Sequence, residues 1–181
     1  MNQFIKYAGV TDRVERVLKR SIKKEAKVAM LKKIIECLDL TSLEGADTPE
    51  RVKRLCYKAK QVHYEMNYPK VAAVCVYPSL AGIARKELEG TRIKVASVAT
   101  YFPSGQVPLK IKLEEAKIAV EEGAHEIDMV INRNYLLSGN YEKVKEEIAE
   151  ILQVCGKTTI LKVILETGEI ETLDRVRLAS D

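Results

Sequence analysis

The chain has 181 residues, of which 46% are hydrophobic and 31% are charged, which is the balance of an ordinary soluble globular domain. The net charge of +4 is spread over mixed acidic and basic residues rather than gathered in one basic block, so nucleic acid is not expected as a partner. The N-terminus has no apolar stretch long enough for a signal peptide or a membrane span, so no membrane partner is expected either.

Four cysteines are widely spaced and form no Cys-x-x-Cys motif. Each lies in an apolar stretch, so we interpret all four as reduced core residues rather than disulfides or metal ligands. This pattern predicts a cytoplasmic protein. The residues are Cys37, Cys56, Cys75 and Cys155.

Residues 1–33 are predicted to form a basic, helical segment, distinct from a second unit at 34–181. Val14, Val17, Leu18 and Ile22 are spaced by three and four residues, which puts them on one helix face. Such a helix can bind a membrane surface, but a lid or packing segment is the interpretation that we favour.

The first strand is predicted in the apolar run Ile34–Leu40. Thr48, Pro49 and Glu50 then predict a helix start, because Thr is a favoured N-cap residue and Pro fits the first helical position. One face of this helix carries Val52, Leu55, Cys56, Ala59 and Val62 or His63.

The same strand-then-helix pattern repeats along the rest of the chain. Strands are predicted at 71–77, 95–102, 126–132 and 159–165, and each is followed by an amphipathic helical pattern. The pattern therefore predicts five βα units of an α/β protein. Two architectures fit: a doubly wound three-layer sheet, which periodicity alone favours, and part of a (β/α)₈ barrel, whose full form needs about 250 residues.

Two charged residues lie inside apolar strands. Asp128 follows Ile127, and Lys162 follows Leu161. An unpaired buried charge is costly, so these residues indicate either an interior ion pair or a functional site, and strand spacing alone does not separate the two readings. Asp39 and Thr41 add polar groups at the end of the first strand, which favours a site.

Nucleotide-binding motifs are absent from the sequence. No Gly-x-Gly-x-x-Gly follows a strand, and no Gly-x-x-x-x-Gly-Lys-Ser/Thr loop occurs. A complete nucleotide- or flavin-binding domain is therefore disfavoured. Neither histidine has a spaced acidic or cysteine partner, so no metal site is expected.

Seven segments, in chain order, carry a resemblance to a known family. They are Leu38–Leu43, Arg54–Ala59, Ala73–Pro78, Val95–Val98, Phe102–Gly105, Gly123–Arg133 and Leu161–Glu169. With these segments the chain resembles the deoxyribose-phosphate aldolases, from about Ser21 to Asp181. The resemblance implies a fold of the (β/α)₈ TIM-barrel type, of which this chain holds about five units.

The resemblance also implies a reaction and roles for particular residues. The reaction is reversible cleavage of 2-deoxy-D-ribose 5-phosphate, a small phosphorylated sugar, to glyceraldehyde 3-phosphate and acetaldehyde, without metal or cofactor. A lysine on the sixth strand forms an imine with the substrate, and a lysine on the seventh lowers its pKa. By the resemblance Asp128 is the proton-relay acid, Lys162 lines the same site, and Asp39, Thr41 and Cys75 lie near the substrate.

The strands with those two lysines have no counterpart in the 181 residues. We therefore expect this polypeptide alone to be a poor aldolase. The alternative is a non-catalytic truncated or degenerate homologue that acts as a binding or regulatory subunit. An open arc of strands would leave inward residues such as Val130 and Ile164 uncovered, so self-association or a need for a C-terminal part is also expected.

Overall fold

In the computed structural model, which describes residues 7–61 and 68–181, five parallel strands form one curved sheet. Their spatial order follows the sequence, and each strand pairs with the next. This order confirms a barrel-type arc and excludes the doubly wound sheet, whose strand order reverses part-way. The strands are β1 (Asp39–Thr41), β2 (Ala73–Val76), β3 (Lys94–Ala99), β4 (Glu126–Val130) and β5 (Ile160–Ile164).

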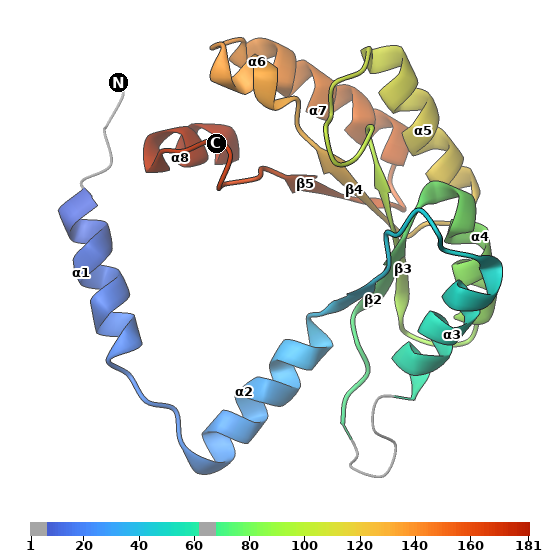
Figure 1. Cartoon of the computed structure of the whole chain (residues 1–181), viewed down its shortest axis with the longest axis horizontal. Coiled ribbons are helices and arrows are strands. Elements are labelled where there is room, and N and C mark those ends of the chain that lie inside the picture. The colour runs from blue at the N-terminus through green and yellow to red at the C-terminus, as the bar shows by residue number, and fades with distance from the viewer. Residues whose placement is uncertain (1–6, 62–67) are drawn as a thin grey trace.

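The helices that pack on the sheet lie on its convex face (Figure 1). They are α3 (Pro49–Lys60), α4 (Pro78–Glu87), α5 (Leu109–Glu121) and α7 (Tyr141–Cys155). The other helices are α1 (Tyr7–Leu18), α2 (Lys24–Glu36), α6 (Arg133–Leu137) and α8 (Leu173–Ser180). Helix α3 starts as predicted, with the Thr48 side chain accepting a hydrogen bond from the Arg51 amide.

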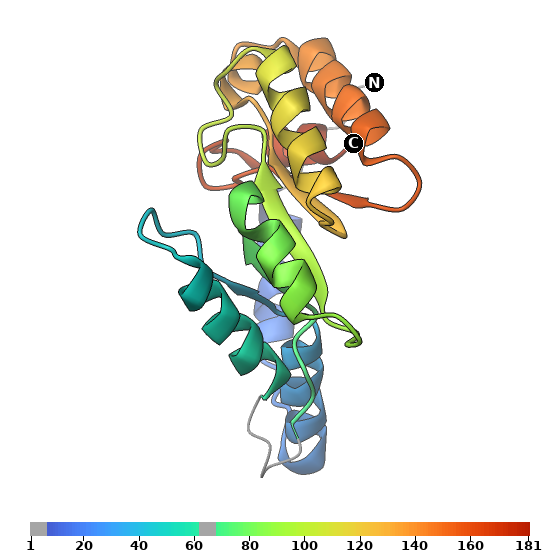
Figure 2. The same cartoon turned by 90° about the vertical axis from the view of Figure 1, so that its right-hand side faces the viewer.

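The hydrophobic core lies between the sheet and these helices. One cluster joins β2 and β3 to α3 and α4, and a second joins β4 and β5 to α5 and α7. Figure 2 shows α3, α4, α5 and α7 side by side over the strands. The concave face carries a smaller apolar cluster of Ala73, Cys75, Ala96 and Val98, against which Leu43, Tyr77 and Phe102 pack. Most of the packing energy therefore lies on the convex side, which leaves the concave side open for polar residues.

The prediction for the start of the first strand is wrong. Helix α2 continues to Glu36 and β1 begins only at Asp39. Short apolar runs fit either a strand or a helix, and here Ile35 packs against the core from the helix. Cys37 ends this helix and is exposed, whereas the other three cysteines are buried, and all four are free thiols. The predicted continuation of α3 to Val62 or His63 lies outside the described residues.

The expectation that Val130 would be uncovered is also wrong, because Val130 is fully buried. The loop after β3 folds over it. Gly105 in this loop has a φ of +68°, and a Cβ added there would lie 2.7 Å from the Ile131 carbonyl oxygen and 3.4 Å from a methyl group of Val130. A glycine is needed at this point because the backbones approach too closely for a side chain. Ile164 is partly buried, on the edge strand β5.

Within the described residues, no helix is both long enough and apolar enough to cross a membrane.

Candidate active site

Strand register brings Asp128 and Lys162 together on the concave face. The two residues are direct neighbours in the β4–β5 pairing. Their side chains form an ion pair with an Oδ1–Nζ distance of 3.0 Å. The predicted proximity of these two residues is therefore confirmed, and it follows from the alternation of side chains along paired strands.

Two further carboxylates contact the same ammonium group. Asp39 Oδ2 lies 2.6 Å from Lys162 Nζ, and Glu126 Oε2 lies 3.0 Å from it. Sequence reasoning placed Asp39 near this rim but missed Glu126. The signal was available, because Glu126 lies two residues before Asp128 and so shares its face of β4. Three carboxylates thus surround one lysine.

These carboxylates keep Lys162 protonated. Burial alone would lower the pKa of Lys162, since it disfavours the charged ammonium group. Hydrogen bonds to Asp39, Asp128 and Glu126 act in the opposite direction and outweigh burial, so the pKa of Lys162 is raised above its usual value. At neutral pH Lys162 is therefore a cation that donates hydrogen bonds and not a nucleophile.

Asp128 is shifted toward the protonated form. Burial raises the pKa of Asp128, and the hydrogen bond and charge of Lys162 offset only part of that rise. The thiol of Cys75 lies 3.7 Å from Asp128 Oδ2 and donates to it. Burial and the nearby Asp128 raise the pKa of Cys75 to about 12, so Cys75 stays a neutral thiol. A carboxyl group with a raised pKa suits the transfer of protons near neutral pH.

Thr41 lies at the exposed end of β1, two residues beyond Asp39. Its register partner in β2 is Cys75, so the backbone places it on the concave face as predicted. Its hydroxyl group donates a hydrogen bond to the Asp39 carbonyl oxygen at 3.0 Å. Of the five predicted site residues, the structure joins Asp39, Cys75, Asp128 and Lys162 directly, and Thr41 lies beside them.

The loops at the C-terminal ends of β3, β4 and β5 are joined by one arginine. Arg133, the first residue of α6, donates to the Pro103 carbonyl oxygen at 3.2 Å and forms an ion pair with Glu166. Sequence reasoning did not single out this contact. It fixes the loops on the side of the sheet where barrel proteins carry their active sites.

The cluster does not have the arrangement of a metal centre. Across residues 7–61 and 68–181, no group of three or more His, Cys, Asp or Glu residues is placed to hold a metal ion. The three carboxylates are instead directed at the Lys162 ammonium group. The geometry suits proton transfer and the binding of a polar ligand.

Fold and site together define a TIM-barrel-type protein with a protonated lysine and carboxylates inside the arc of strands. The family model for DeoC/LacD aldolases matches residues 20–174. The chain belongs to the DeoC/LacD family of aldolases.

Individual relatives agree with this assignment. The chain is 44% identical to the deoxyribose-phosphate aldolase of Mus musculus over 188 aligned residues, which cover 97% of this chain and 59% of the mouse protein. A solved structure from Coccidioides immitis is 34% identical, with a TM-score of 0.72 over 82% of this chain and 55% of that one. A tetrameric deoxyribose phosphate aldolase from Aeropyrum pernix is 27% identical, with a TM-score of 0.63 over 82% of this chain and 61% of that one. The chain therefore spans less than two thirds of the length of these relatives.

Proposed function

We propose that the concave face of this chain belongs to a deoxyribose-phosphate aldolase site, which cleaves 2-deoxy-D-ribose 5-phosphate reversibly to glyceraldehyde 3-phosphate and acetaldehyde through a lysine imine. The observation that carries the proposal is the contact of Asp128 with Lys162 in a family member that is 44% identical to the mouse aldolase. Asp39 and Glu126 complete the polar cluster.

Asp128 is assigned the role of proton relay. Cleavage of the carbon–carbon bond requires a base to take the proton of the substrate hydroxyl group, and an acid to return a proton to the carbon that becomes the methyl group of acetaldehyde. Burial raises the pKa of Asp128 toward the range in which one carboxyl group can do both. Lys162 holds the ionised form of Asp128 by a direct ion pair.

Lys162 is assigned a positioning and electrostatic role rather than imine formation. An imine forms from a neutral amine, and Lys162 is held as an ammonium group by three carboxylates. The imine-forming amine in this proposal is therefore another lysine, which the resemblance to the family assigns to a sixth strand. Asp39, Thr41 and Cys75 are assigned to the substrate-facing wall.

Turnover of 2-deoxyribose 5-phosphate by the purified chain, followed as acetaldehyde release, tests the proposal. Replacing Asp128 by Asn should lower any turnover by about 10²–10⁴-fold, the usual contribution of a positioned acid–base group. Glu121→Gln, a change on the exposed end of α5, is the matched control and should leave turnover unchanged. Turnover that is above background and equal in wild type and Asp128→Asn would refute the role of Asp128.

A second candidate function is a non-catalytic binding or regulatory subunit. The specific observation in its favour is the protonated state of Lys162, since the amine at the centre of this cluster is not a nucleophile. This candidate predicts that the chain binds 2-deoxyribose 5-phosphate without releasing acetaldehyde. Calorimetric titration with the sugar phosphate, run beside the turnover assay, separates the two functions.

The cytoplasm is the location that we propose. All four cysteines are free thiols, and three of them are buried without a disulfide partner. Cysteines that remain free thiols are typical of proteins in a reducing compartment.

A further inference from the structure

The ammonium group of Lys162 has three N–H donors, and three carboxylates surround it. Its Nζ atom lies 2.6 Å from Asp39 Oδ2, and 3.0 Å from both Glu126 Oε2 and Asp128 Oδ1. The proposed function assigns the proton relay to Asp128 and a place on the substrate-facing wall to Asp39. It assigns no task to Glu126, although one ammonium group does not need three carboxylates to be neutralised.

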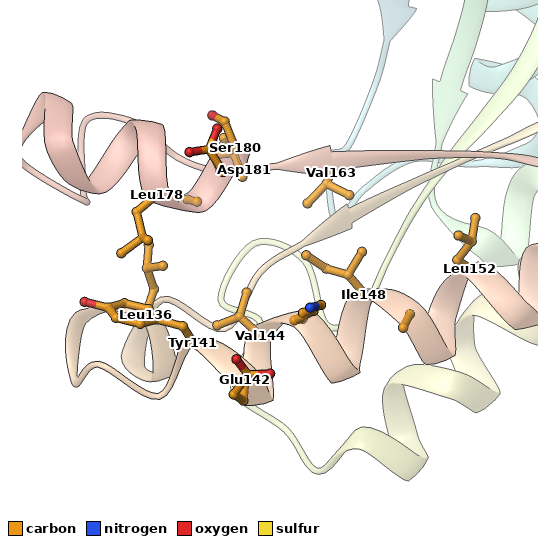
Figure 3. A pocket seen from close by; sticks show the side chains of 14 residues that line it. Leu136, Tyr141, Glu142, Val144, Ile148, Leu152, Val163, Leu178, Ser180 and Asp181 are labelled. Atoms are coloured by element: carbon orange, nitrogen blue, oxygen red, sulfur yellow. The ribbon is translucent and has the colours of Figure 1, made fainter. Parts of the chain in front are cut away.

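Strand β5 has two different faces. On the helix side of the sheet, Val163 of β5 and Ile148 of α7 line an apolar groove (Figure 3). Side chains alternate along a strand, so Lys162, the residue before Val163, points to the opposite, concave side. The three ion pairs of Lys162 therefore all lie on the concave face.

Glu126 and Asp128 contact the ammonium group from different levels of the sheet. Asp128 is the register partner of Lys162, whereas Glu126 pairs with Ile160. Glu126 therefore lies on the same face of β4 as Asp128, but two residues nearer the N-terminal end of the strand. Barrel enzymes bind substrate at the C-terminal ends of their strands. Glu126 thus holds Lys162 from the side away from substrate, which we call the floor side, and Asp128 holds it from the substrate side.

The titratable groups around Asp128 come from four strands, and its register partner on β3, Val98, is uncharged. They are Asp39 of β1, Cys75 of β2, Glu126 of β4 and Lys162 of β5. Burial raises the pKa of Asp128, Lys162 lowers it, and the charges of Asp39 and Glu126 raise it again. The proton affinity of Asp128 therefore depends on how the carboxylates share the charge of Lys162.

We propose that Glu126 is a positioning residue, which holds Lys162 on the floor side of the site so that Asp128 can keep a proton near neutral pH. Without the charge of Glu126, Lys162 would favour the ionised form of Asp128 more strongly. The loss of a like charge beside Asp128 acts in the same direction. Glu126 acts only through these two residues and takes no part in bond breaking. The inference rests on the proposed role of Asp128 as proton relay.

A pH titration of Asp128, followed by carbon NMR of the aspartate carboxyl groups, tests the proposal without requiring turnover. Asp128→Asn identifies the signal, and the midpoint in the wild-type chain should lie above about 4, the usual value for Asp. Glu126→Gln keeps the shape of the side chain and an acceptor for Lys162, and it should lower the midpoint by about one pH unit. Glu126→Ala, a second variant without the charge, should lower it as well. Glu121→Gln, on the exposed end of α5, is the matched control and should leave it unchanged.

The outcomes separate the role of Glu126 from a structural role and from the proposed function. A purely structural role would lower the free energy of unfolding of the Glu126 variants but leave the midpoint of Asp128 unchanged, which would overturn the inference. Lys162→Met should raise the midpoint, and a midpoint that does not rise would also overturn it. A lower midpoint in Glu126→Gln without acetaldehyde release from the wild-type chain would support the role of Glu126 and count against the aldolase reaction of this chain. Acetaldehyde release with an unchanged midpoint would overturn the role of Glu126 alone.

Discussion

Asp39 of β1 and Lys162 of β5 contact each other at 2.6 Å, although 123 residues separate them in the sequence and three strands lie between them in the sheet. In a flat sheet with strands about 4.8 Å apart, the first and fifth strands would be about 19 Å apart, too far for these two side chains to meet. The contact is therefore possible only because the sheet is strongly curved. Because of this curvature, residues on the two edge strands, β1 and β5, lie in one site.

Lys162 should not form an imine with substrate at neutral pH, because three carboxylates hold it as an ammonium group. Incubation with 2-deoxyribose 5-phosphate and borohydride, followed by peptide mass spectrometry, should show no reduced adduct on Lys162. Lys162→Met is the control that identifies the peptide. A stoichiometric adduct on Lys162, together with turnover, would mean that the ammonium group loses its proton far more easily than its surroundings indicate.

Stability should decrease with rising pH through the titration of Asp128. Its folded-state pKa is raised, so the folded chain binds this proton more tightly than the unfolded chain does. The free energy of unfolding therefore falls as pH rises from about 4, the usual value of an unfolded Asp, through the raised folded pKa. Lys162, whose pKa is also raised, contributes stability that is complete below about pH 10 and is lost above it.

Urea unfolding of wild type and Asp128→Asn, measured at several pH values between 4 and 8, checks this slope. The Asp128→Asn chain should show a flatter dependence of unfolding free energy on pH. Glu121→Gln again controls for the loss of one carboxylate. Identical slopes in wild type and Asp128→Asn would contradict the raised pKa.

A buried ion pair joins α5 to α7. Lys112 Nζ lies 2.8 Å from Glu147 Oε2, and their side chains are 0% and 6% exposed. Lys112→Met or Glu147→Leu alone should lower the free energy of unfolding by about 3–5 kcal/mol, because each leaves one buried charge without a partner. The double variant should be far less destabilised than the sum of the two. Urea denaturation of all four chains measures the coupling, and additive losses would exclude it.

Tyr101 occupies an unfavourable backbone conformation. Its φ is +62°, directly after Thr100 at +63°, and both values lie in the left-handed region that favours glycine. Glu115 holds this turn by accepting a hydrogen bond from the Tyr101 amide at 2.6 Å. Replacing Tyr101 by Gly should raise the free energy of unfolding by about 1 kcal/mol relative to Tyr101→Ala, which removes the same ring but keeps the strain. A more stable Tyr101→Ala would show that the conformation is not strained.

Local sequence patterns were enough to predict the strand–helix units and the polar residues inside them. Five apolar runs separated by amphipathic helices predicted five strand–helix units, and the charges at Asp128 and Lys162 stood out against their apolar neighbours. The order of the strands in the sheet followed only from the family resemblance, because periodicity alone favoured a doubly wound sheet. Both signals are local, because strand alternation and helix periodicity depend on residues a few positions apart. The alternation of side chains along β4 also places Glu126 on the same face as Asp128, but Glu126 was not predicted as a site residue.

Which of these residues contact one another depends on the packing of distant elements. Nothing local to Asp39 shows that it reaches Lys162, since that contact depends on the curvature of the whole sheet. Likewise, the continuation of α2 to Glu36 and the burial of Val130 depend on packing against segments distant in sequence. Local patterns specify which face of an element is apolar or charged, but contacts between distant elements arise only when those faces pack together and the sheet bends.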